Sequence, residues 1–97
     1  MLGKYVTVRR YEGVTDIAAA ARMVQTGFVP LIDKIKGFVA YYWVDAGGGV
    51  TVSTSIFHDQ AGEEESNKIA REWITENLAA VFPNPPQITA GKVVAHS

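Results

Sequence analysis

The chain has no cysteine and few charged side chains. Without cysteine, its 97 residues can form neither a disulfide nor a thiolate nucleophile. Asp, Glu, Lys and Arg make up 20% of the residues, below the roughly 25% usual in soluble domains. The net charge is −1 and the basic residues are scattered, so no positive stripe is available for phosphates. We therefore expect no nucleic-acid partner, and we expect part of the surface to be buried by another molecule.

Long apolar runs and clusters of metal-ligating side chains are also missing. No stretch of 18 apolar residues exists, and residues 1–4 lead into a strand pattern instead of an apolar signal core. We expect a cytoplasmic protein with no membrane partner. His58 and His96 are isolated, so we predict no metal site and no cofactor. Asp59 follows His58, but an aspartate at this position is better explained as a helix cap than as the partner of a general base.

Hydrophobic periodicity predicts one domain, residues 1–97, with the element order β-α-β-β-α-β. Residues 5–10 alternate as a strand, and residues 16–36 form an amphipathic helix that Pro30 should kink near Gly27. A second helix runs from the cap Asp59 to about Phe82, and residues 92–96 are the fourth strand. Right-handed crossovers then favour a ferredoxin-like α+β fold, an antiparallel sheet of strand order 4-1-3-2 with both helices on one face.

A β-hairpin, residues 38–44 and 50–57, organises this sheet. The glycines between its strands suit a tight reversal, and we expect Val44 to lie opposite Val50. One hairpin face is then mostly apolar, and we predict that the helices cover it together with two valines of the first strand. These predicted core residues are Val6, Val8, Phe38, Ala40, Tyr42, Val52 and Ile56.

The other sheet face combines large aromatics with hydroxyls and has no helix left to cover it. An exposed patch of this kind is larger than monomers usually tolerate, so we predict a homodimer through this face. The predicted interface residues are Tyr5, Thr7, Arg9, Tyr41, Trp43 and Phe57.

A small-molecule pocket is predicted between the sheet and the second helix. Asn77 falls within the apolar stripe of that helix, where a buried amide needs polar partners. Tyr42 and Thr54 are expected to face it from the sheet, with Trp73 beside it on the helix. The alternative is a closed core in which Tyr42 and Asn77 satisfy each other or the backbone. No pattern identifies a catalytic residue.

Two segments carry a resemblance to a known family. Residues 37–42, Gly-Phe-Val-Ala-Tyr-Tyr, resemble the usual Pro-Gly-Phe start of strand two in the dimeric α+β barrel proteins, with Lys36 in place of the proline. Residues 55–59, Ser-Ile-Phe-His-Asp, followed by an acidic helix, are similar to the strand-three exit of the antibiotic-biosynthesis-monooxygenase-like branch.

The resemblance implies a homodimer with small-molecule pockets, and it leaves two function classes open. Haem degradation is disfavoured, because Thr7 stands where those enzymes have asparagine and the second helix has no histidine. The first class is a cofactor-free monooxygenase of an aromatic or phenolic substrate, which relies on residue types present here as Arg9, Tyr41, Tyr42, Trp43, Trp73 and Asn77. The second is a non-catalytic binding or stress-related protein of the same fold.

Overall fold

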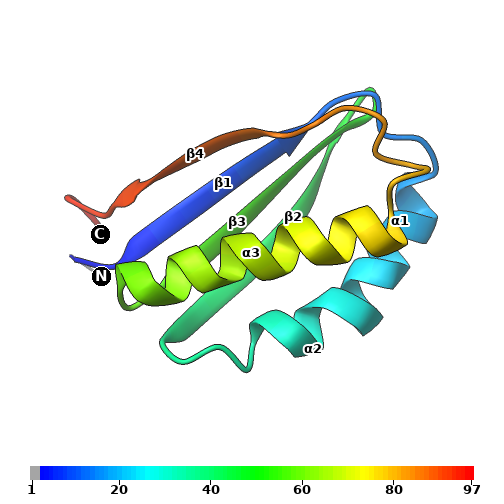
Figure 1. The fold of residues 1–97 in the computed structure, drawn as a ribbon. Coiled ribbons are helices and arrows are strands. Elements are labelled where there is room, and N and C mark those ends of the chain that lie inside the picture. Colours follow the sequence, from blue (N-terminus) through cyan, green and yellow to red (C-terminus); the bar gives the residue numbers. More distant parts are fainter. Residues whose placement is uncertain (1–2) are drawn as a thin grey trace.

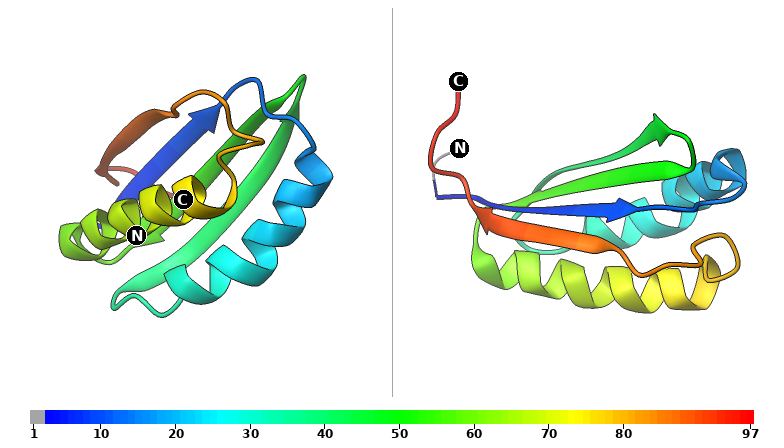
Figure 2. Two further views of the ribbon diagram at one scale, coloured as in Figure 1. Left: turned by 45° about the vertical axis from the view of Figure 1, so that its right-hand side comes forward. Right: turned by 90° about the horizontal axis from the view of Figure 1, so that it is seen from above.

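The computed structural model describes residues 3–97, so Met1 and Leu2, which begin the segment expected to lead into the first strand, lie outside the described residues. Four strands form one antiparallel sheet in the order β2-β3-β1-β4, and the helices lie on one side of it (Figures 1 and 2). The predicted ferredoxin-like fold class is confirmed. The elements are β1 (Tyr5–Tyr11), α1 (Ile17–Met23), the π-helical segment η1 (Val24–Phe28), α2 (Val29–Ile32), β2 (Phe38–Gly47), β3 (Val50–Phe57), α3 (Gln60–Asn77) and β4 (Gln87–Lys92).

Aspartates cap both helical regions, and Asp59 is the cap predicted for the second. Asp59 Oδ1 accepts a hydrogen bond of 2.9 Å from the Gly62 amide at the start of α3. Asp16 Oδ1 accepts one of 3.1 Å from the Ala19 amide at the start of α1. Each bond satisfies an amide that has no partner inside the first turn of its helix.

The first helical region widens into a π-helix just before Pro30. Pro30 has no N–H for the carbonyl of Thr26, which removes one α-helical hydrogen bond. The amide of Val29 instead reaches the carbonyl of Val24, five residues back. The irregularity expected near Gly27 therefore takes the form of one wide turn, η1, rather than a simple kink.

The hairpin pairs two residues out of the predicted register. Val44 lies opposite Val52, and Gly47 lies opposite Val50, so the reversal comes later than expected. Gly47, Gly48 and Gly49 all have positive φ angles, which places the turn at these residues. Because the shift is even, residues 40–44 and 50–57 stay grouped on the same faces as predicted. A bulge between Phe38 and Ala40 turns Phe38 to the other face, where its ring centroid lies 5.9 Å from that of Phe57.

The prediction of which sheet face the helices cover is wrong. Thr7 and Phe57 are 0% exposed and Arg9 is 4% exposed, beneath α3, although all three were assigned to the open face. Tyr41 packs under η1, with its ring centroid 5.3 Å from that of Phe28. The helices contribute bulky apolar side chains, and these pack well onto a face where aromatics alternate with small hydroxyls. The aliphatic face, predicted as core, is the open one, and it carries Val6, Val8, Ala40, Tyr42, Val44, Val52, Thr54 and Ile56.

The fourth strand is Gln87–Lys92, not residues 92–96 as predicted. It begins directly after Pro86 and pairs with the free edge of β1, with Ile88 opposite Arg9. Its six residues are all exposed, so it has no hydrophobic alternation to mark it, and the valines that follow it suggested the wrong segment. None of the helices formed by residues 3–97 combines the length and apolar character needed to cross a bilayer.

Candidate functional site

A cavity of about 520 Å³ lies at the end of β1, between the second half of α3, the loop that follows it, and β4. α3 packs over β3 and β1, and β4 is the edge strand next to β1 (Figure 1). The volume is in the range of sites for small organic ligands. The lining is apolar at Tyr11, Ile74, Ala79, Phe82, Pro83, Pro85, Pro86 and Ile88, and polar at Arg9, Asn67, Arg71, Thr75 and Asn84.

One face of α3 forms the helical wall of this cavity. Asn67, Arg71, Ile74 and Thr75 are spaced so that they lie above one another on a helix, and all four line the cavity. Arg71 and Thr75 are exposed, whereas Asn67 and Ile74 are half-buried. The helix therefore presents three polar groups and one aliphatic side chain to a ligand.

A chain of buried hydrogen bonds joins this wall to the sheet. Glu63 Oε1 accepts a bond of 2.7 Å from Thr7 Oγ1 and another of 2.7 Å from Asn67 Nδ2. The carbonyl oxygen of Asn67 in turn accepts a bond from Arg9 Nη2. The Asn67 amide is thereby oriented from both ends, and it holds the Arg9 guanidinium at the cavity wall.

Burial governs the electrostatics around Arg9. It lowers the pKa of this guanidinium, although the neighbouring Tyr11, Tyr41 and Glu63 oppose the effect. Burial also raises the pKa of both Tyr11 and Tyr41, partly offset by the charge of Arg9. Both phenols are therefore neutral near pH 7, and Arg9 remains the charged group among them.

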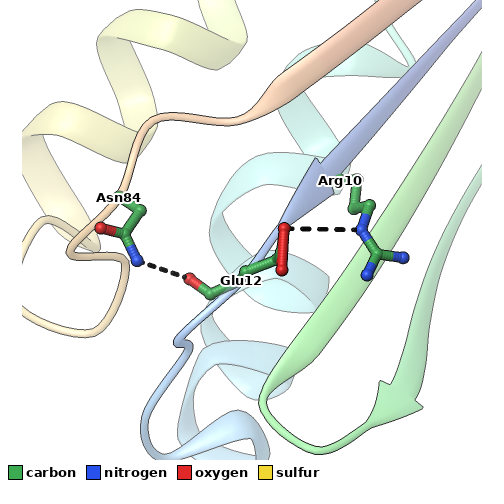
Figure 3. Close-up of polar contacts among 3 residues, drawn as sticks. All are labelled: Arg10, Glu12 and Asn84. Atoms are coloured by element: carbon green, nitrogen blue, oxygen red, sulfur yellow. Dashed lines mark hydrogen bonds and ion pairs between the residues drawn. The ribbon is translucent and has the colours of Figure 1, made fainter.

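The loop after α3 is fixed to the end of β1, so the far wall of the cavity is well defined. Asn84 Nδ2 donates a bond of 3.1 Å to the backbone carbonyl of Glu12 (Figure 3). The Thr15 amide donates one of 3.1 Å to the carbonyl of Val81. Phe82 packs on Tyr11 with ring centroids 4.5 Å apart. The ion pair of Arg10 and Glu12 drawn in the same figure is exposed, so it contributes little.

A second, much smaller void lies deeper between the sheet and the helices. Its volume is about 10 Å³, room for roughly one water molecule. Trp73 borders it, and the ring centroid of Phe28 lies 5.5 Å from that of Trp73. The space beside Trp73 is therefore closed core in this conformation, with no room for an organic ligand.

The four residues predicted to line a pocket do not converge. Tyr42 is 60% exposed and lies opposite Thr54 on the open face, across the sheet from Trp73. Asn77 was expected to be buried, but it is exposed at the last residue of α3 and donates a bond of 2.9 Å to the Trp73 carbonyl. Any role of these four residues in ligand binding remains a prediction, without a shared pocket to support it.

Sequence reasoning missed the residues that do line the cavity on α3. Asn67 and Arg71 were not singled out, and neither was Glu63, which lies outside the lining but orients Asn67. Their spacing of four residues, with the apolar Ala70 and Ile74 beside them, was the available signal: polar residues on the sheet-facing edge of an amphipathic helix. The cavity itself depends on where β4 begins, which the pattern did not indicate.

Residues 3–97 contain no group of three or more His, Cys, Asp or Glu side chains placed to hold a metal ion.

No protein-family model matches the sequence, and no curated protein matches it. Solved structures do match. A protein of unknown function from Nitrosomonas europaea, NE2512, is 23% identical with a TM-score of 0.80, over 99% of this chain and 94% of that one.

Two further solved structures relate the fold to named proteins. The monooxygenase from the gene ActVA-Orf6 of Streptomyces coelicolor, in complex with the ligand nanaomycin D, is 14% identical with a TM-score of 0.77, over 99% of this chain and 91% of that one. The chain has the fold of the antibiotic biosynthesis monooxygenase-like proteins. A dimeric ferredoxin-like protein from an uncultured marine organism shares this fold at 16% identity and a TM-score of 0.69, over 98% of this chain and 99% of that one.

Proposed function

We propose that this protein binds a small aromatic molecule in the cavity between α3 and β4 and oxidises it with molecular oxygen, without a cofactor. The observation that supports this most directly is the cavity of about 520 Å³, whose walls are mainly apolar with a few polar groups on one side. Rings such as those of Tyr11 and Phe82 suit the flat face of an aromatic ligand. The monooxygenases of the same fold add support by analogy.

Oxidation without a cofactor requires the substrate to supply the electrons. In a substrate of the anthrone type, a ring CH₂ becomes C=O; one oxygen atom of O₂ enters the product and the other leaves as water with the two hydrogens. The substrate must ionise before it can reduce O₂. The cavity lining, drawn from residues 3–97, includes no His, Asp or Glu side chain that could accept the proton of the substrate. The lining residues would therefore stabilise the ionised form of the substrate without acting as its base.

The lack of His, Asp and Glu side chains in the described cavity lining supports the second candidate, a non-catalytic binding protein of this fold. A cavity whose described lining lacks a general base can bind an aromatic molecule without converting it. Such a protein would need the cavity and the wall held by Asn84, but no defined position for oxygen.

Oxygen uptake and binding, measured in parallel, separate the two candidates. We would screen anthrones and naphthoquinols with an oxygen electrode and follow binding by tryptophan fluorescence. Ala79→Trp places a bulky ring in the cavity, while Ala80→Trp makes the same change at the next exposed residue, outside the lining. Uptake that is lost only in Ala79→Trp supports the oxygenase. Binding without uptake supports the binding protein, and no binding of any compound contradicts both.

We also propose that two copies associate through the open aliphatic face. Tyr42 is 60% and Val44 is 48% exposed there, and half-exposed valines of β1 and β3 surround them. Isolated monomers rarely leave an apolar area of this kind in water. A dimeric protein of the same fold supports the proposal. Of the residues first predicted for the interface, Thr7, Arg9 and Phe57 are buried and Tyr41 and Trp43 pack on the core, so the interface would be formed by the opposite face.

A further inference from the structure

Arg9 is a buried cation without an acidic partner at the cavity wall. Its side chain is 4% exposed, and the hydrogen bond found for its guanidinium within residues 3–97 goes to the neutral Asn67. The one ion pair among these residues joins Arg10 to Glu12, on the exposed end of β1. A guanidinium has five N–H donors, so Arg9 retains donors for another acceptor. Leaving such a charge unpaired in the interior is unfavourable.

Arg71 supplies a second unpaired cation to the same wall. Its neighbours one turn away on α3 are Asn67, Lys68, Ile74 and Thr75, none of which is acidic. Arg9 and Arg71 line the same cavity. Burial is the main cause that lowers the pKa of Arg9, and the charge of Arg71 lowers it further. Two cations near each other are stabilised by an anion between them.

Glu63, an acidic side chain whose charge acts on Arg9, does not form an ion pair with it. Its Oε1 is already bonded to Thr7 and Asn67, and the residue does not line the cavity. Among the lining residues, Arg9 and Arg71 are the two charged ones. The cavity therefore combines a positive edge next to α3 with apolar walls opposite.

We infer that the natural ligand is an aromatic acid, whose carboxylate lies between Arg9 and Arg71 and whose ring packs against Phe82, Pro85 and Ile88. This inference rests on the proposed function only in using the same cavity as the binding site. A carboxylate is favoured because its two oxygens match the planar fork of a guanidinium. It would also give Arg9 a direct ionic partner, which no side chain of residues 3–97 provides.

The test compares an acid with its uncharged ester. Dissociation constants of 2-naphthoate and methyl 2-naphthoate are measured by calorimetry at pH 7 and low salt. The wild type is expected to bind the acid about tenfold more tightly than the ester, the scale of one charged hydrogen bond. Arg71→Gln should raise the dissociation constant of the acid about tenfold and leave that of the ester unchanged. Arg22→Gln, the same change at an exposed residue of α1, should alter neither constant.

Salt and a second variant test the electrostatic origin of the preference. Added salt should weaken binding of the acid more than binding of the ester, since it screens the exposed Arg71. Arg9→Lys keeps the positive charge but lacks the paired N–H donors of a guanidinium, so we expect an intermediate loss of affinity for the acid. The fold of this variant is verified by circular dichroism. Unlike Arg71→Gln, this variant changes a buried group, so its urea unfolding curve is measured alongside.

The outcomes separate this inference from the proposed oxygenase. Equal affinities for acid and ester, or an equal loss for both in Arg71→Gln, would overturn the inference even if phenols are oxidised. Selective binding of the acid with no oxygen uptake would support the inference and count against the oxygenase. No binding of either naphthalene compound would overturn the inference.

Discussion

Thr7 and Glu63 form a buried hydrogen bond of 2.7 Å between residues 56 positions apart in the sequence, one on β1 and one on α3. Thr7 is 0% and Glu63 is 5% exposed, so water cannot replace either partner. The same Glu63 oxygen also accepts a bond from Asn67, which holds Arg9. The bond therefore contributes both to the attachment of α3 to the sheet and to the position of the cavity wall.

Removing this carboxylate should destabilise the fold. Glu63→Ala leaves the buried hydroxyl of Thr7 without a partner, and we expect the free energy of unfolding in urea to fall by about 1 to 3 kcal/mol. Glu64→Ala, an exposed neighbour on the same turn, should change it by less than about 0.5 kcal/mol. Equal effects of the two substitutions would mean that the buried bond contributes nothing beyond helix propensity.

Stability should decline in alkaline solution because of Tyr41. Burial raises the pKa of this phenol above its ordinary value of 10.0, so the unfolded chain loses the proton first as the pH rises. The contribution is fully present below pH 10 and declines above it, because the unfolded state then binds fewer protons than the folded state. We expect unfolding free energies that are flat from about pH 7 to 9 and fall beyond about 10.

Tyr41→Phe removes the titrating group and should reduce the slope of this decline. Tyr42→Phe, which removes a phenol that is 60% exposed, should leave the slope as it is. The measurement is a series of urea titrations between pH 7 and 11. An unchanged slope in Tyr41→Phe would show that other groups cause the alkaline loss; Tyr11, whose pKa burial also raises, would be the next to test.

Gly27 allows η1 to approach α3 closely. A Cβ atom on this residue would lie 2.8 Å from Cζ2 of Trp73, a ring that Phe28 already packs against. We expect Gly27→Ala to destabilise the protein by about 1 to 3 kcal/mol through overpacking. In Gly91→Ala, where an added Cβ meets nothing within 4 Å, no such clash arises. Combining Gly27→Ala with Trp73→Phe should recover part of the loss, and strict additivity in thermal unfolding would argue against the contact.

A charge at the centre of the open face should prevent the proposed association. Val8 lies on the inner strand β1 between Thr54 and Thr89 of its neighbours, and its side chain shares the open face. Light scattering should give twice the 10.5 kDa of one chain for the wild type and a single chain for Val8→Glu. Leu31→Glu, at a residue of α2 that is 44% exposed, should remain a dimer. A monomeric wild type would contradict the proposal.

The fold could be read from the sequence because its strongest signals are local. Caps at Asp16 and Asp59, Pro30 in a helix and glycines in a turn each act within a few residues, and all appear near the expected positions. The grouping of side chains on each sheet face was also correct apart from Phe38, since it follows from the two-residue repeat of a strand, which the bulge after Phe38 interrupts.

Which face of the sheet the helices cover could not be predicted in the same way. Aliphatic residues such as Val8 and Val52 suggested a core, but an apolar face can also be buried by a second subunit, and the sequence does not distinguish the two. Arg9 was assigned to the open face, as part of the predicted interface. Its hydrogen-bond partner Asn67, which Glu63 orients, comes from a helix more than fifty residues away.

The wide turn of η1 keeps the buried side chains of the first helical region on one side of the helix. Val24, Phe28 and Ile32 are all buried, yet they are spaced by four residues each time. In a regular α-helix each such step would rotate the side chain by about 40° away from the previous one. The π-helical turn accommodates the extra residue, so the buried side chains remain in one line. Because this turn absorbs one extra residue, deleting Gln25 would return the segment to a regular α-helix and keep Ile32 facing the sheet.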